Sequence, residues 1–199
     1  MTPVSKVSSR DASASVQLRT YVPADFSNLY IIDQACYEPR IAYSRTELRQ
    51  YLRFPGAGCV VAEAMQQNFA VAAQSNYMEA MRKNSAEAVP KSSAETTQSN
   101  PAPPMVGFCI TAHKAGWGYI VTMDVLLPYR RHGIGSMLLV EAERRLIAAG
   151  VRQIGLETAT DNSAAIAFWQ KHGYRKIGIR KGYYPDGRDA FAMTKPIAR

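Results

Sequence analysis

The 199-residue chain is poor in cysteine, poor in acidic residues and without any long apolar run. Its three cysteines lie far apart and form no Cys-x-x-Cys pair, which argues against a zinc knuckle and against a disulfide framework. No apolar run is long enough to span a membrane, and no secretory apolar segment stands at the start. We therefore expect a cytoplasmic protein with no metal centre and no membrane partner.

The charge balance of the chain is basic, since 24 Lys and Arg residues face 16 Asp and Glu residues, a net charge of +8. A positive net charge suits an anionic ligand. The basic residues are scattered rather than gathered in runs, which disfavours nucleic acid as a partner, and a solvated basic surface accounts for most of them. The length and a hydrophobic share of 47% fit one domain with a substantial core.

Two segments have the composition of chain that does not fold by itself. Residues 1–15 are rich in Ser and Ala, and residues of about 65–104 are rich in Ala, Ser, Gln, Asn and Pro. We interpret them as a disordered N-terminal tail and as a low-complexity insertion within a single domain over 16–199. Such an insertion is either a functional loop or a tolerated surface addition, and we favour the second.

Hydrophobic periodicity and turn signals give the order of the elements. The first helix should bury Phe26, Leu29, Ile32 and Ala35, and Ser44-x-x-Glu47 is a capping box that opens the second helix. Helices are predicted over 23–36, 44–53, 137–149 and 161–172, and strands over 16–21, 58–63, 105–111, 117–126, 153–158, 174–180 and 190–194. This order predicts an α/β protein with a mixed, mostly antiparallel sheet of six to seven strands and helices on both faces.

The most informative stretch runs over 118–149, where a buried strand, a basic glycine loop and an amphipathic helix follow one another. Such a loop aims the free N–H groups and the positive end of the helix dipole at one point, and its glycines allow a bulky anion to approach. The expected occupant is a phosphate or pyrophosphate. Neither the P-loop nor the three-glycine dinucleotide fingerprint is present.

The pattern Arg130-x-x-Gly133-x-Gly135 matches the Q/R-x-x-G-x-G/A signature of the GNAT superfamily of N-acetyltransferases. Over about its last 80 residues the chain resembles the ribosomal-protein-alanine branch of that superfamily. The resemblance rests on V-L-L-P-Y-R-R-H-G-I-G, on L-E-T-A-T-D-N-S-A-A-I-A-F-W-Q-K-H-G-Y and on Y-Y-P-D-G-R-D-A-F-A-M. It implies the GNAT acyltransferase fold and acetyl-coenzyme A as cosubstrate.

The resemblance also implies residue roles. The strand residues 123–125 would offer backbone to the pantetheine arm, the loop 130–136 would hold the pyrophosphate, and Asn162 and Trp169 would contact the cofactor from the next helix. The implied cofactor-binding residues are Met123, Asp124, Val125, Arg130, Arg131, His132, Gly133, Ile134, Gly135, Ser136, Asn162 and Trp169. Asn162 also has the sequence position of a helix cap, and it could do both jobs.

Glu157 would be the general base, and Tyr183 and Tyr184 would line the path of the acceptor amine. Glu157 ends a buried strand, where it could instead be a structural carboxylate paired with an arginine; desolvation in a cleft would raise its pKa toward that of a useful base. The two tyrosines could equally form only a turn.

One position departs from the family pattern, because Trp169 stands where the family's proposed general acid is a tyrosine. An indole cannot donate a proton at neutral pH. Tyr174, Tyr183 or Tyr184 could supply the proton, or no acid is needed because a thiol of pKa about 8.5 is already a fair leaving group.

These residues predict direct acetyl transfer from acetyl-coenzyme A to the N-terminal α-amine of a protein or peptide, since no cysteine lies in a nucleophile motif. One alternative is acetylation of a lysine, a polyamine or another small amine. A second alternative is an acyl-coenzyme A sensor without catalysis. The presence of Trp169 favours this alternative, whereas the presence of Glu157 argues against it.

Overall fold

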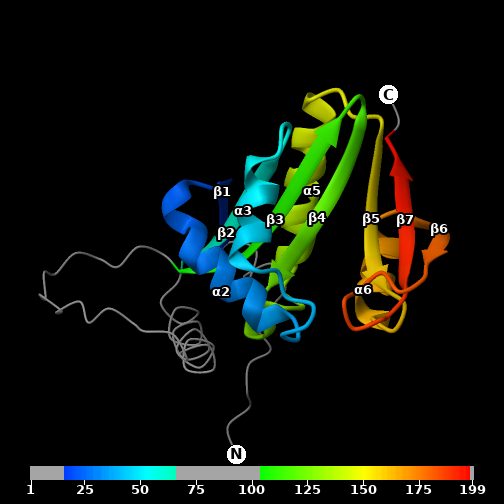
Figure 1. The fold of residues 1–199 in the computed structure, drawn as a ribbon. Helices are drawn as coiled ribbons and strands as arrows, with labels where there is room; N and C mark the ends of the chain where they lie inside the picture. Colours follow the sequence, from blue (N-terminus) through cyan, green and yellow to red (C-terminus); the bar gives the residue numbers. More distant parts are fainter. Residues whose placement is uncertain (1–15, 66–103, 198–199) are drawn as a thin grey trace, which may run out of the picture.

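The computed structural model describes residues 16–65 and 104–197. The predicted tail over 1–15 and nearly all of the predicted insertion lie outside the described residues. Within them, the chain folds into one sheet covered by helices (Figure 1).

The sheet has seven strands in the order β1-β2-β3-β4-β5-β7-β6. All neighbouring strands are antiparallel except β4 and β5, which are parallel. The predicted mixed, mostly antiparallel sheet is therefore confirmed. The strands are β1 (Val16–Thr20), β2 (Gly58–Ala64), β3 (Met105–Lys114), β4 (Trp117–Val125), β5 (Gln153–Ala159), β6 (Arg175–Arg180) and β7 (Ala190–Pro196).

Helices cover both faces of the sheet, as predicted (Figure 1). One face carries the helices that precede β2, and the other carries the helices that flank β5. The first group is η1 (Pro23–Asp25), α2 (Phe26–Cys36) and α3 (Arg45–Arg53), and the second is α5 (Ile134–Ala148) and α6 (Ser163–Lys171), with the short η2 (Leu127–Tyr129) before α5.

The helix ends that the sequence predicts are capped as expected. The hydroxyl of Ser44 accepts a hydrogen bond from the N–H of Glu47 at 3.2 Å, and the Glu47 carboxylate accepts one from the N–H of Ser44 at 2.8 Å. The side chain of Asn162 accepts from the N–H of Ala165 at 3.0 Å and so caps α6. Each such cap stabilises its helix by about 1 kcal/mol.

β4 contains one residue more than its partner β3 at the point where Ile110 pairs with Thr122 and Thr111 pairs with Ile120. An extra residue in one strand reverses which side chains face which way beyond it. As a result, the side chains of Tyr119, before the extra residue, and of Thr122, after it, point to the same side of the sheet. This is the side covered by α2 and α3. The hydroxyls of Thr122 and of Tyr37, which follows α2, lie 3.2 Å apart.

The parallel contact between β4 and β5, which we call the β4–β5 seam, is short. It comprises three residue pairs, Trp117 with Gln153, Gly118 with Ile154 and Tyr119 with Gly155. Beyond Tyr119 the two strands diverge toward their C-terminal ends (Figure 1). The edge of β4 that faces β5 is therefore unpaired over the residues that lead into the glycine loop.

Candidate active site

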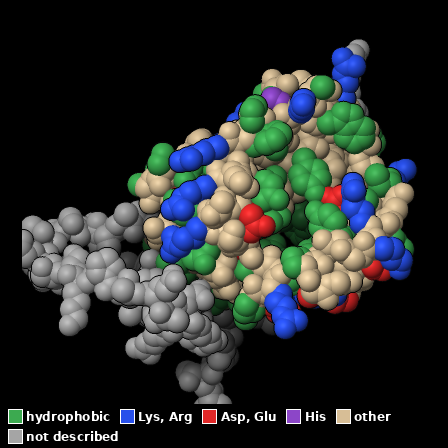
Figure 2. Space-filling model, in the orientation of Figure 1, with side chains coloured by type: hydrophobic (Ala, Val, Ile, Leu, Met, Phe, Trp, Pro, Cys, Tyr) green, Lys and Arg blue, Asp and Glu red, His purple; other side chains and the backbone are tan. Residues whose placement is uncertain are grey.

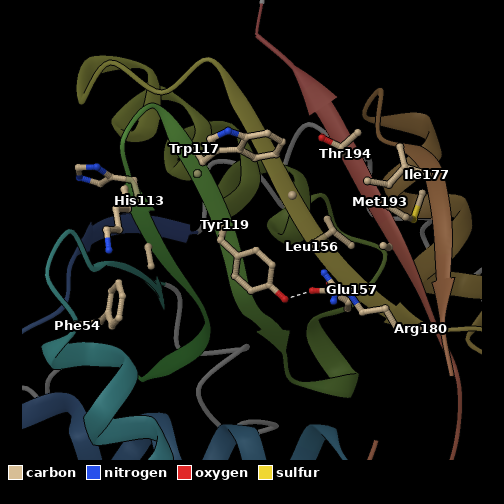
Figure 3. A pocket seen from close by; sticks show the side chains of 15 residues that line it. Phe54, His113, Trp117, Tyr119, Leu156, Glu157, Ile177, Arg180, Met193 and Thr194 are labelled. Atoms are coloured by element: carbon tan, nitrogen blue, oxygen red, sulfur yellow. Dashed lines mark hydrogen bonds and ion pairs between the residues drawn. The ribbon is translucent and has the colours of Figure 1, made fainter. Parts of the chain in front are cut away.

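A cavity of about 310 Å³ lies over the first halves of β4 and β5, on the α2 and α3 side of the sheet. We call it the β4–β5 cavity. Figure 2 shows this face hollowed near its centre, with hydrophobic side chains around the hollow. Its lining is mostly apolar and aromatic and includes Phe54, Trp117, Tyr119, Leu156, Ile177 and Met193 (Figure 3). Apolar concave sites with few polar groups are the usual form of ligand pockets.

Glu157 supplies the carboxylate of this cavity (Figure 3). One of its oxygens accepts a hydrogen bond from the hydroxyl of Tyr119, and the other lies 2.6 Å from Nε of Arg180. The Glu157 side chain is only 6% exposed. Burial raises the pKa of Glu157, and the nearby Arg180 guanidinium offsets part of this rise. A carboxylate with a raised pKa and a fixed orientation is suited to accept a proton near neutral pH.

Tyr183, in the loop between β6 and β7, reaches the same place. Its hydroxyl oxygen lies 3.5 Å from that of Tyr119, and its ring packs edge-on against Tyr184 with centroids 5.1 Å apart. Burial raises the pKa of Tyr183, and it raises the pKa of Tyr184 to about 12. The fold thus brings Tyr183 close to Glu157, and the ring of Tyr184 packs against that of Tyr183.

Tyr174, which the sequence offered as a further proton donor, lies elsewhere. Its hydroxyl donates to Oε1 of Glu143 on α5 at 2.9 Å, and the side chain is 1% exposed. Tyr174 is therefore a core residue, away from Glu157 and outside the lining of the β4–β5 cavity.

The glycine loop ends at the start of α5. Gly133 has φ +84°, and Arg131 before it has φ +69°, so both adopt the left-handed region. A Cβ on Gly133 would meet nothing within 4 Å, so the backbone angle and not the available space calls for glycine there. The first helical bond runs from the N–H of Met137 to the carbonyl of Gly133 at 3.0 Å, which leaves the N–H groups of the first turn of α5 to a ligand or to solvent.

Side chains of the loop also hold the fold together. Nε of Arg130 donates to the carbonyl of Val125 at 2.7 Å, and the hydroxyl of Ser136 lies 3.0 Å from Nε2 of His172. His172 is half-buried and joins the end of α6 to the start of α5. The cofactor roles of Arg130 and Ser136 stay predictions.

Two other predicted cofactor residues have neighbours within the protein. Trp169 is 7% exposed and packs edge-on against Phe168 and Tyr174, with centroids 5.0 and 5.4 Å away. The side chain of Asp124 is buried beneath α2, where its carboxylate accepts from the hydroxyl of Thr122 at 3.2 Å. Burial raises the pKa of Asp124 to about 7. The side chain of Asp124 thus has its partners within the protein, and its backbone pairs with Phe108 of β3, so that Met123 and Val125 are the residues whose backbone faces the unpaired edge of β4.

Sequence reasoning missed Tyr119 and Arg180. Tyr119 contacts Glu157 because the β4–β5 seam ends at its pair with Gly155, and this register is not visible in the sequence. Arg180 had a usable signal, since it stands three residues before Tyr183 at the end of a predicted strand.

Within residues 16–65 and 104–197, no helix is long and apolar enough to cross a membrane. Among those same residues, no group of three or more His, Cys, Asp or Glu side chains could hold a metal ion.

The site thus combines a strand, a glycine loop and a helix N-terminus with a short parallel seam and a buried carboxylate, and comparison with known proteins identifies the family. Residues 26–174 match the acetyltransferase (GNAT) family, and the chain belongs to that family.

Two curated relatives carry more specific names. An N-alpha-acetyltransferase of Saccharolobus solfataricus is 39% identical over 82 residues, which are 40% of this chain and 48% of that protein. The [ribosomal protein bS18]-alanine N-acetyltransferase of Escherichia coli K12 is 36% identical over 97 residues, 47% of this chain and 66% of that protein. The chain thus spans about half the length of the first of these relatives and less than two thirds of the second.

Solved structures share the fold. The ribosomal-protein-S18-alanine N-acetyltransferase from Escherichia coli aligns with a TM-score of 0.66 at 21% identity, over 92% of this chain and 95% of that one. Ard1 from Thermoplasma volcanium aligns with a TM-score of 0.68 at 20% identity, over 93% of this chain and 99% of that one.

Proposed function

We propose that this protein transfers the acetyl group of acetyl-coenzyme A to the N-terminal α-amine of a protein or peptide. The observation that carries the proposal is the Glu157 carboxylate, buried and oriented by Tyr119 and Arg180 at the end of the β4–β5 seam. The names of the two curated relatives, both N-terminal or alanine acetyltransferases, support the choice of acceptor.

The residues present fit coenzyme A, which would supply an acyl thioester. The N–H groups of the loop and of the first turn of α5 would hold its pyrophosphate, because they point out of a helix N-terminus and lie next to Arg131 and His132. At the unpaired edge of β4, Met123 and Val125 would offer backbone groups to the amide-containing pantetheine arm, with the carbonyl of Val125 already accepting from Arg130. Structures named as complexes with coenzyme A occur among proteins of similar fold.

Glu157 is the proton acceptor in this proposal. An α-amine with a pKa near 8 is about a tenth neutral at pH 7, whereas a lysine with a pKa of about 10.4 is neutral to less than a thousandth. One carboxylate with a raised pKa, acting directly or through a water, suffices for the first kind of amine. Tyr119 and Arg180 position the carboxylate, and Tyr183, whose hydroxyl lies 3.5 Å from that of Tyr119, would line the path of the acceptor.

The three cysteines do not offer a covalent route. Cys59 and Cys109 are buried, and burial raises the pKa of Cys36 to about 12, so none is a ready thiolate at neutral pH. Direct attack by the amine follows.

Incubation with acetyl-coenzyme A, a panel of peptides and a panel of small amines, read by mass spectrometry, tests the proposal. Acetylation confined to lysine or polyamine would replace the acceptor, and binding of coenzyme A without any product would make the protein a sensor.

Glu157→Gln tests the base. It keeps the shape and removes the basicity, so turnover at pH 7 should fall by about 10² to 10⁴ while the affinity for acetyl-coenzyme A barely changes. The loss should shrink as pH rises, because more of the amine is then neutral without help. Glu141→Gln, a carboxylate paired with Arg144 and Arg145 on α5, is the matched control and should keep normal turnover.

A further inference from the structure

The β4–β5 cavity is surrounded by large apolar side chains that remain in contact with water. Phe54, Trp117 and Ile177 line it and are 49%, 56% and 65% exposed. Single exposed apolar residues are ordinary, but three around one cavity mark a surface that a ligand covers. A volume of about 310 Å³ lies at the lower limit of small-molecule pockets, roughly 300 to 1,000 Å³, and suits one or two side chains.

Gly155 lines this cavity, and it has no side chain to occupy space there. A Cβ on Gly155 would meet the carbonyl oxygen of Met193 at 3.7 Å and the ring of Tyr119 at 3.8 Å, which are ordinary contact distances. A side chain at position 155 is therefore compatible with the fold, and it would occupy space beside Tyr119 that is otherwise open to a ligand.

Arg180 stands at the mouth of the cavity with most of its surface in water. Its side chain is 60% exposed, and only its Nε has a partner, Glu157, among the residues that the structure describes. Its two terminal nitrogens therefore present a planar fork of N–H donors at the mouth, which matches the geometry of a second carboxylate.

The other charged groups around the cavity are also basic or already neutralised. Lys114 and His113 lie on its wall, and the Glu157 carboxylate is shared between Tyr119 and Arg180. The rim is thus apolar and carries cationic hydrogen-bond donors. A ligand that matches it has an apolar group next to an acidic group.

The position of the base sets the order of these two groups in a peptide. When the α-amine lies at Glu157, the side chain of the first residue starts two bonds from the nitrogen and is the one that can enter the cavity. In an extended peptide the next side chain points to the opposite side, toward the mouth.

We propose that the β4–β5 cavity selects acceptor N-termini that begin with a large apolar residue such as methionine followed by an acidic residue, with Arg180 as the receptor for that acidic side chain. This inference rests on the proposed function and names the class of peptide that the same site takes. It departs from an alanine acceptor, whose methyl group would leave the cavity unfilled.

Four peptides that differ only in their first two residues test it: Met-Asp, Met-Lys, Ala-Asp and Ala-Lys. We expect kcat/KM to be at least about tenfold higher for Met than for Ala, because several methylene equivalents are buried. We expect Asp to exceed Lys by about tenfold, and this ratio should fall as salt is added because Arg180 is exposed.

Two variants separate the two parts of the site. Gly155→Val fills the floor and should reverse the preference between Met and Ala, and Gly155→Ala serves if the valine variant does not fold. Arg180→Gln should bring the Asp-to-Lys ratio below about threefold, keep the preference for Met, and move the acidic limb of the pH profile upward, because Glu157 loses its cation. Ile179→Ala and Arg175→Gln, exposed residues of β6 outside the cavity, are the matched controls and should change neither ratio.

The outcomes are distinguishable. Equal rates for the four peptides would overturn this inference and leave the proposed function standing, whereas no acetylation of any peptide would overturn the proposed function itself. An unchanged Met-to-Ala ratio in folded Gly155→Val, or an unchanged Asp-to-Lys ratio in Arg180→Gln, would remove the cavity or Arg180 from the proposal.

Discussion

Asp33, in the middle of α2, makes the stability of the protein depend on pH in a direction opposite to that of most acidic residues. It is 0% exposed, and its Oδ2 accepts hydrogen bonds from the N–H of Tyr43 at 2.9 Å and from Nε2 of Gln34 at 3.0 Å. Its Oδ1 has no partner among the described residues. Burial, together with the nearby Asp124 carboxylate, raises the pKa of Asp33 to about 8.

The sign follows from the proton count. An unfolded aspartate has a pKa of about 3.9, so between about pH 4 and 8 the folded protein holds one proton at Asp33 that the unfolded chain has lost. The free energy of unfolding then falls by about 1.4 kcal/mol for each pH unit. Asp33 alone removes about 2.7 kcal/mol between pH 5 and pH 7, and the stability it contributes is complete only below about pH 4. Asp124, whose pKa burial raises to about 7, acts in the same direction.

Urea unfolding at pH 5, 6 and 7 measures this effect. Asp33→Asn keeps an oxygen for Tyr43 and Gln34 but does not titrate, so its loss of stability from pH 5 to pH 7 should be about 2.7 kcal/mol smaller than that of the unaltered protein. Glu141→Gln is the control, since arginine neighbours lower the pKa of Glu141 to about 2 and it does not titrate in this range. Identical pH slopes for Asp33→Asn and the unaltered protein would refute the reasoning.

Two further predictions concern the glycine loop and the segment between β2 and β3. Gly133→Val should raise the Kd for coenzyme A at least about tenfold in calorimetric titration, because a branched residue disfavours φ +84° by about 1–2 kcal/mol and obstructs the approach of an anion; an unchanged Kd in a folded variant would contradict this. Replacing residues 66–103 by a short Gly/Ser turn should leave the melting transition and coenzyme A binding nearly unchanged, because the N–H of Ala64 already bonds the carbonyl of Pro104 at 3.0 Å and closure entropy varies slowly with loop length; a melt that is no longer cooperative would show the opposite.

Local signals in the sequence predicted the elements well, because each is set by neighbours within a few residues. The capping box at Ser44, the cap at Asn162 and the alternating strands depend only on local spacing. The apolar face of α2 was predicted less well: Leu29 and Ile32 are buried as expected, but Ala35 is exposed. Periodicity gave no reason to bury Asp33, which depends on where α2 meets the sheet.

The candidate site was predictable only where a motif is continuous in the chain. The glycine loop and Glu157 each stand in such a motif. The partners of Glu157 come from two other strands: Tyr119 depends on the three-pair register of β4 with β5, and Arg180 depends on the pairing of β6 with β7 and of β7 with β5. Such long-range details follow from the packing of the whole sheet, and a single sequence does not contain them in readable form.

The short β4–β5 seam also determines how the protein would respond to a pulling force. β1 and β7 lie on opposite sides of the seam, so tension applied between residues 16 and 197 must cross it. Three residue pairs, the packing of α5, the hydrogen bond from Tyr119 to Glu157 and the ion pair of Arg188 with Glu38 link the two sides of the seam. The seam is thus the place where we expect the sheet to separate first under tension. A ligand bound across it would connect the β1–β4 half of the sheet to the β5–β7 half and raise the force needed to separate them.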